Sequence, residues 1–219
     1  METSVKRPRT YKSAVRSEQA RRTRERIVAA ARERFIAGGY ATTSLASIAE
    51  LAGVAAETVY DSFGNKRQLL EAVVEATIVG ATDESADITE RGWVQELLGL
   101  PDLAARIDGF ARHTAQTVAR MAPIHALIRT AAAADAGLSE LAVSVQANRF
   151  ANQRRVLAAL LGSDATATRV AAETFSALAS PELQHVLVSV QGWSQTRYTA
   201  WLRRTVGLTV AVPQAGRLG

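Results

Sequence analysis

Residues 42–66 read TTSLASIAELAGVAAETVYDSFGNK, and this stretch decides the fold. Leu45, Ile48 and Ala52 recur at helical spacing, so they predict the buried face of a short helix. Gly53 follows at once, and glycine readily takes the left-handed conformation that closes a helix C-terminus. The stretch therefore begins with a helix that ends in a tight turn.

A second short helix is predicted after that turn. Val59 and Phe63 lie four residues apart, so they would form its inner face. Its outer face would carry Ala55, Ala56, Glu57, Thr58 and Tyr60. Two short helices around a tight turn form a helix-turn-helix, the motif that places its second helix against DNA.

The flanking sequence extends this pattern. Residues 26–35 predict an amphipathic helix, which a glycine pair at positions 38 and 39 ends. Thr43 and Ser44 are both suited to cap the first helix of the motif. After the second helix, Gly64 breaks the pattern and Asn65 can cap a further helix.

The order of these elements resembles the N-terminal domain of the TetR (tetracycline-repressor-like) family of bacterial transcription regulators. The resemblance extends over about residues 21–71, through the ordered motifs Gly-aromatic-x-Thr-Thr, Ile-Ala-x-x-Ala-Gly-Val, Thr-Val-Tyr-x-x-Phe and Asn-Lys-x-x-Leu-Leu. The chain departs from the family at Ala55, Glu57 and Ser62, where Ser, Gly, and an aromatic residue or His are common. The resemblance implies that these positions face the DNA, so the departures bear on which DNA sequence is read.

The resemblance implies an all-α fold, with an N-terminal three-helix helix-turn-helix domain and a C-terminal helical domain that binds an effector and dimerises. The residues expected at base edges are Ala55, Ala56, Glu57 and Thr58, and those expected at phosphates are Thr43, Tyr60 and Lys66. Glu57 has a second interpretation, because a carboxylate in the first turn also complements the helix dipole. Tyr60 could instead pack against the preceding helix, and Lys66 could simply be solvated.

The positive charge is concentrated at the N-terminal end. Residues 1–71 contain 13 Lys and Arg against 8 Asp and Glu, whereas residues 72–219 contain 13 of each. Residues 1–16 read as a flexible basic arm that displaces counterions from phosphates, although a solubilising terminus would have the same composition. The predicted domains are this arm, a DNA-binding domain over 17–70 and a helical domain over 71–219.

Composition excludes several other functions. The chain has 219 residues and no cysteine, so disulfides, thiolate metal sites and cysteine nucleophiles are excluded. It has no apolar run long enough for a membrane span, and no nucleophile elbow, Walker motif or His-Glu-x-x-His motif. We therefore expect a cytoplasmic protein that is not an enzyme and needs no cofactor or metal. The alternative is a helical adaptor that binds an acidic partner.

The rest of the chain reads as almost entirely helical. The helices expected there span about 66–84, 93–100, 101–120, 124–134, 137–161, 166–179 and 181–208. The breaks between them are assigned to Gly and Pro, including one at Pro123. The domain boundary is placed inside the helix that begins at Lys66, which would then serve both domains.

The resemblance further implies that the last two long helices build a homodimer, which would read a palindromic operator. Apolar stripes permit this, through Val170, Phe175, Leu178, Leu183, Val186, Leu187, Val190 and Trp193. A stripe of this kind also forms the core within one chain, so both interpretations stay open.

The resemblance also implies an effector cavity within the middle helices. The polar and aromatic residues that could line it are Trp93, Phe110, His113, Gln116, Thr117, Met121, His125, Arg129, Asn148 and Asn152. They suit an apolar small molecule, with an acidic group meeting Arg129. A metal effector fits poorly, because the three histidines form no His-x-x-x-His pair. The effector itself, and the choice between repression and activation, cannot be read from the sequence.

Overall fold

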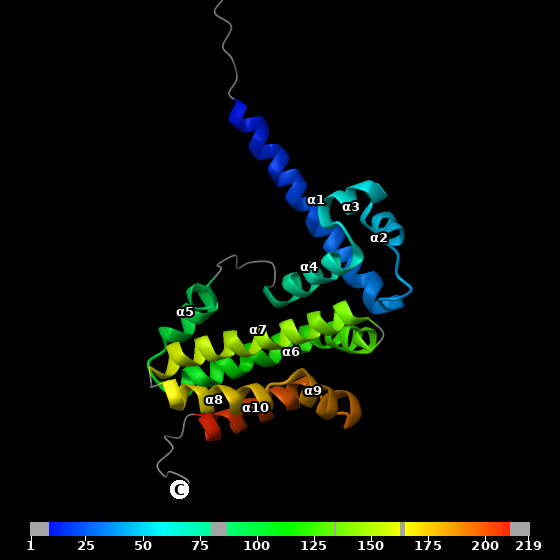
Figure 1. Cartoon of the computed structure of the whole chain (residues 1–219). Helices are drawn as coiled ribbons and strands as arrows, with labels where there is room; N and C mark the ends of the chain where they lie inside the picture. The colour runs from blue at the N-terminus through cyan, green and yellow to red at the C-terminus, as the bar shows by residue number, and fades with distance from the viewer. Residues whose placement is uncertain (1–8, 80–86, 134, 163–164, 211–219) are drawn as a thin grey trace, which may run out of the picture. The chain divides into compact units, whose positions relative to one another are not determined.

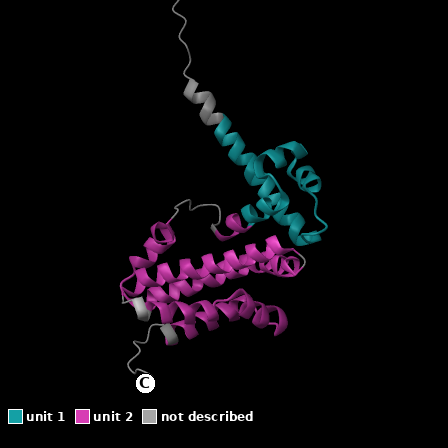
Figure 2. Ribbon diagram, viewed as in Figure 1, with its two compact units in different colours: residues 1–73 teal, residues 74–219 magenta. Residues whose placement is uncertain are grey.

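The computed structural model describes residues 9–79, 87–133, 135–162 and 165–210, and within these ranges the chain forms helices and no strand (Figure 1). The prediction of an all-α fold is confirmed. The chain divides into two compact units, residues 1–73 and residues 74–219 (Figure 2). Among the described helices, none has the length and apolar character needed to cross a bilayer.

The first unit contains α1 (Arg9–Gly38), α2 (Leu45–Ala52), α3 (Ala56–Phe63) and the beginning of α4 (Lys66–Val79). α1 packs on α2, and α2 packs on α3. The side chains that fill this core are almost fully buried: Ile27, Ala31, Phe35, Ile48, Ala49, Val59, Phe63, Leu69 and Leu70. The apolar positions at helical spacing therefore form one small core, as the sequence predicts.

α1 begins earlier than expected, because residues 9–16 of the predicted flexible arm are helical. The segment after Pro8 contains neither Gly nor Pro until Gly38, and it is rich in Ala, Arg, Glu and Gln, which favour helix. The remainder of the predicted arm, residues 1–8, lies outside the described residues.

The second unit is built on a bundle of α6 (Leu103–Ala132), α7 (Ala136–Leu161), α8 (Ala165–Leu178) and α10 (Gln195–Val210) (Figure 1). α6 and α8 each pack against both α7 and α10, so the four helices close around one core. α5 (Gly92–Leu98) packs on α6 after a short 3₁₀ helix, η1 (Ile88–Glu90). Gly109 permits this approach, because a Cβ there would overlap the side chain of Leu97.

The predicted break at Pro123 is wrong, because α6 continues through it to Ala132. A proline inside a helix removes one backbone hydrogen bond and costs about 3 kcal/mol. Pro123 lies on the exposed side of α6, whereas Met121, Ile124 and Ile128 are buried on the other side. Packing of this continuous apolar stripe outweighs the local loss.

The last predicted helix, over 181–208, is interrupted. α9 (Pro181–Gln184) passes into a π-helix, η2 (His185–Val190), and the chain leaves the helix before α10 begins at Gln195. Gly192 has a φ of 72°, in the left-handed region that favours glycine. Ser194 then accepts a hydrogen bond from the backbone nitrogen of Arg197 and restarts the helix. The apolar stripe masked this stop-and-start signal in the sequence.

Candidate nucleic-acid interface and ligand cavity

α2 is capped by a side chain at its start, and backbone geometry closes its end at the turn to α3. Ser44 caps α2, because its hydroxyl accepts a hydrogen bond from the nitrogen of Ser47 at 3.1 Å. Gly53 has a φ of 64°, and Val54 donates to the carbonyl of Ala49 at 3.0 Å. This is the left-handed helix ending that the sequence predicts.

α3 presents one buried face and one exposed face. Val59 and Phe63 are buried against the core. Ala55 and Glu57 are exposed, as is Tyr60 with 55% of its surface accessible, while Ala56 and Thr58 are half-buried. Ala55 supplies no side-chain cap, as its lack of a hydroxyl predicts. The outer face of α3 is therefore available for a partner.

Arg24 holds the C-terminal end of α3 against α1. Its Nη1 donates to the carbonyl of Ser62 at 2.9 Å, and its guanidinium lies 4.1 Å from the centre of the Phe63 ring. Although Arg24 belongs to the basic N-terminal part of the sequence, the structure gives it an internal contact. The orientation of α3 thus depends on a cation–π pair and a hydrogen bond at its C-terminal end.

Lys66 and Thr43 also make internal contacts. The Lys66 ammonium donates to the carbonyls of Tyr40 at 2.9 Å, Thr43 at 3.1 Å and Ala41 at 3.4 Å. The Thr43 side chain is buried, with its Oγ1 at 2.8 Å from the carbonyl of Gly39. Both side chains therefore shape the connection between α1 and α2, which was not foreseen from the sequence.

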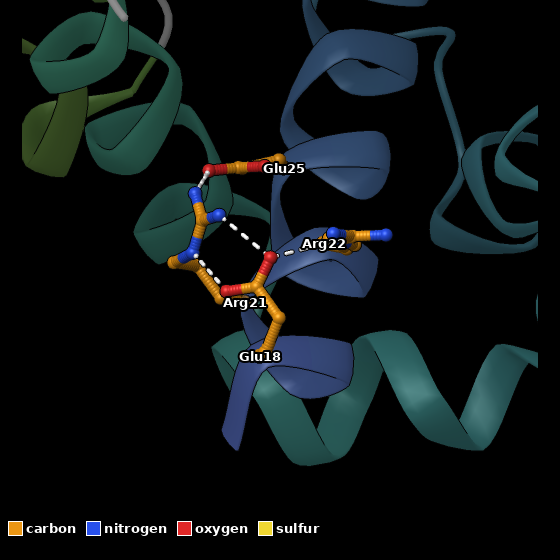
Figure 3. A network of polar contacts seen from close by, with 4 residues as sticks. All are labelled: Glu18, Arg21, Arg22 and Glu25. Atoms are coloured by element: carbon orange, nitrogen blue, oxygen red, sulfur yellow. Dashed lines mark hydrogen bonds and ion pairs between the residues drawn. The ribbon is translucent and has the colours of Figure 1, made fainter. Parts of the chain in front are cut away.

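The exposed part of α1 carries paired charges (Figure 3). Arg21 lies between Glu18 and Glu25, and Arg22 contacts Glu18 at 2.7 Å. Hydrogen bonds from Arg21 and Arg22 lower the pKa of Glu18 to about 2. Exposed pairs of this kind add little stability, so these arginines can exchange their partners for phosphates at small cost.

A cavity of about 130 Å³ lies in the second unit, between α5, α6 and α7. Eight of the predicted effector residues line it together: Trp93, Phe110, His113, Thr117, Met121, His125, Asn148 and Asn152. Arg129 and Gln116 do not line it, because both are exposed on other faces of α6. Ile78, near the end of α4, also contributes to the lining.

Stacked rings form one wall of this cavity. The Trp93 ring is nearly parallel to that of His113, with centroids 3.8 Å apart, and to that of Phe110 at 6.1 Å. Burial lowers the pKa of His113 to about 4, assisted by the charges of Arg120 and Arg91. His113 is therefore neutral at pH 7, as suits a ring stacked against an indole.

Arg149 is the main charged group of this lining that was not predicted from the sequence. Its Nη1 donates to Gln153 Oε1 and to the carbonyl of Ser176, both at 3.2 Å, and its Nε donates to Gln146. Burial lowers the pKa of Arg149, with no change in its charge at pH 7. Helical spacing alone does not show which of several arginines on α6 and α7 points inward.

Comparison with known proteins places the first unit in a family. The model described as "Bacterial regulatory proteins, tetR family" matches residues 27–73. The HTH-type transcriptional regulator TtgR of Pseudomonas putida is 34% identical over 87 residues, which cover 37% of this chain and 41% of TtgR. The first unit of the chain thus matches the TetR family. Its match spans less than half the length of TtgR.

Solved structures share the fold of this chain along most of its length. A protein of Mesorhizobium loti assigned to the TetR family has a TM-score of 0.68 at 21% identity, covering 88% of this chain and 96% of its own. NalD of Pseudomonas aeruginosa, the secondary repressor of the MexAB-OprM multidrug efflux pump, has a TM-score of 0.59 at 20% identity, covering 85% and 95%. At these identities the likeness is one of fold. The curated relative is named as a transcription regulator, and the family model describes regulatory proteins.

The residues predicted for a dimer interface differ in how far the single chain buries them. Phe175 and Leu187 are buried in the core of the single chain. Val186 and Val190 are exposed, with 42% and 70% of their surfaces accessible. The others are partly buried: Val170, Leu178, Leu183 and Trp193. Only part of each apolar stripe is thus available to a second chain.

Proposed function

We propose that this TetR-family chain is a cytoplasmic transcription regulator that binds DNA through α3 and releases it when a small molecule occupies the cavity of the second unit. The exposed outer face of α3, held by a closed turn on one side and by Arg24 on the other, carries this proposal. A helix held in this way suits the major groove, where its side chains reach base edges.

The distribution of charge suggests that α1 contacts phosphates and that α3 reads bases. α3 carries Glu57 and Asp61 and no basic residue, so it repels phosphates and adds little affinity of its own. Arg21 and Arg22 on α1 have exposed guanidinium groups, which supply affinity without sequence information. Thr58 and the methyl groups of Ala55 and Ala56 then remain to read bases, with Tyr60 at the backbone.

We infer a homodimer that reads a palindromic operator. The exposed valines of η2, Val186 and Val190, lie in the C-terminal part of the chain that the family resemblance assigns to dimerisation. Two copies related by a twofold axis would present two α3 helices to half-sites about one helical turn apart. Repression is the proposed outcome, as the name of NalD states for that relative in fold.

The ligand response would act through α4. This helix begins at Lys66, which holds the connection between α1 and α2, and its residue Ile78 lines the cavity. A ligand that prefers one position of α4 over another would bias the position of the DNA-binding unit. A near-complete switch requires a preference of about 10⁴-fold between the two states.

An electrophoretic mobility shift with genomic fragments at physiological salt tests DNA binding. We expect nanomolar binding that resists competitor DNA. Tyr60→Ala should weaken it by tenfold or more, about 1.4 kcal/mol, because Tyr60 is exposed and its loss leaves the core intact. The dimer, measured by analytical ultracentrifugation, should be unchanged in this variant. Absence of specific binding by the parent chain would contradict the proposal and favour an adaptor that binds protein.

A further inference from the structure

The charges around the cavity have one sign. Two arginines, Arg91 and Arg149, and two histidines line it, and among the described residues no Asp or Glu does. The nearest acidic influence on Arg149 and His125 is Glu182, which is exposed and lies outside ion-pair distance of Arg149. A cationic ligand would find no countercharge in the lining, whereas an anionic ligand would find a guanidinium.

Arg149 is held in place by neutral groups. The hydrogen bonds of its Nη1 and Nε go to side-chain amides and backbone carbonyls, and within the described ranges no carboxylate lies within 4.0 Å of it. Its Nη2 makes no hydrogen bond to any described residue. Gln153, which is buried and lines the cavity, accepts from Arg149 through Oε1, which leaves its amide nitrogen as a second donor.

The rest of the lining suits a flat ring. Trp93, His113 and Phe110 lie nearly parallel to one another, and Met121, Val118 and Val156 supply apolar surface. The volume, about 130 Å³, is close to that of engineered apolar cavities of about 150 Å³ that hold benzene. The cavity therefore has room for one aromatic ring with a small substituent.

We propose that the cavity between α5, α6 and α7 binds a small aromatic carboxylate, with the ring against Trp93 and His113 and the carboxylate on the guanidinium of Arg149. This rests on the proposed function only in that the ligand would be the effector. The planar fork of an arginine matches a carboxylate and bonds it more strongly than a neutral group. The sequence had assigned this role to Arg129, which lies outside the lining.

Isothermal titration calorimetry of the full chain without DNA tests the ligand class. The probes are benzoate, benzamide and benzylamine, which share one ring and differ in charge. We expect benzoate to bind about tenfold more tightly than benzamide, because only benzoate brings a negative charge and two equivalent acceptor oxygens to the guanidinium. Benzylamine should not bind. Equal affinities for benzoate and benzamide, or no binding of benzoate at millimolar concentration, would overturn the proposal.

The variant Arg149→Met tests the residue, and Arg129→Met on α6 is the matched control. Arg149→Met should lose the preference for benzoate over benzamide while it still binds benzamide, which shows that the cavity has kept its shape. Arg129→Met should keep the preference. An unchanged preference in Arg149→Met would contradict the assignment. The ligand series on the parent chain needs no variant, so it decides the question even if Arg149→Met fails to fold.

The experiments distinguish a failure of the proposed function from a failure of the proposed ligand class. If benzoate binds with the Arg149 dependence but DNA binding is absent, the proposed function is wrong and the cavity assignment stands. If specific DNA binding is present but benzoate does not bind, the regulator stands and the ligand class is wrong.

Discussion

Lys66 is the residue whose contacts depart most from its expected role. Its ammonium has three N–H donors, and three backbone carbonyls between Tyr40 and Thr43 accept them. It also lies 4.5 Å from the centre of the Tyr40 ring. A phosphate would have to compete with these partners, so we infer that Lys66 acts on DNA binding mainly by shaping the connection between α1 and α2.

Lys66→Met should therefore lower both stability and DNA affinity. Hydrogen bonds to a charged group contribute about 1.5–3 kcal/mol, and their loss leaves the three carbonyls without this donor. Thermal unfolding measures the change, with Arg67→Met as the control because Arg67 is exposed and pairs only loosely with Glu71. A Lys66→Met protein that melts like its parent would show that these hydrogen bonds add nothing.

Substitution of Ala55 is expected to raise the stability of the protein. It lies at the N-cap of α3 with an extended backbone, φ −70° and ψ 150°, and without a side-chain cap. Ala55→Ser should stabilise the protein by about 1 kcal/mol, because a serine hydroxyl can accept from a free backbone nitrogen of the first turn. Chemical denaturation compares it with Ala56→Ser, inside the helix, which should bring no gain. Equal effects of the two substitutions would refute the cap geometry.

His113 makes stability depend on pH. Its pKa in the folded chain is about 4, below the usual 6.5, so the unfolded chain binds the proton first as pH falls. The free energy of unfolding should therefore decrease between pH 6.5 and pH 4, by at most about 3 kcal/mol from this residue. Urea unfolding at several pH values should show a shallower decrease in His113→Gln. Parallel pH profiles would contradict the burial of this ring.

At the scale of elements, α6 combines a proline with an unbroken helix. Pro123→Ala should restore one backbone hydrogen bond and raise stability by about 1–3 kcal/mol, since Pro123 is exposed and packs little. Calorimetric melting tests this, and Ala122→Pro should do the reverse by adding a second proline next to the first. A loss of stability in Pro123→Ala would mean that the helix is adapted to its proline.

The sequence predicted the helices correctly where the apolar spacing and the capping residues indicate the same boundaries. α2, the turn at Gly53 and α3 follow directly from the apolar spacing of Leu45, Ile48, Val59 and Phe63. The sequence prediction was wrong at Pro123 and Gly192. At each position a helix-breaking residue favours a break, whereas the surrounding apolar stripe favours a continuous helix. The helix continues through Pro123 but is interrupted at Gly192. Local pattern cannot weigh tertiary packing, which sets the outcome at such positions.

The candidate sites divide in a similar way. Polar residues among apolar ones on α6 and α7 predicted most of the cavity lining, because helical spacing places them on one face. Helical spacing could not show whether Arg129 or Arg149 lines the cavity, because this depends on which face of each helix packs against its neighbour. The internal contacts of Lys66 and Arg24 were not predicted for another reason: their partners are backbone carbonyls and a ring far away in the sequence.

At the scale of the whole molecule, the positive charge and the cavity fall in different units. Residues 1–71 carry the excess of positive charge, and residues 72–219 carry none. The second unit holds the cavity and the exposed valines of η2. α4 is the one element that has residues in both units, so a regulated DNA-binding protein built in this way would use α4 to connect ligand and operator.

We propose that two copies of the chain each place α3 in a major groove. Selection of bound DNA from a random pool tests it most directly, because it reports sequence preference and symmetry together. We predict enrichment of a palindrome whose half-sites are centred about 10 base pairs, one helical turn, or a multiple of this, apart. Enrichment of a single unrepeated site, or of no sequence at all, would contradict this binding by two α3 helices.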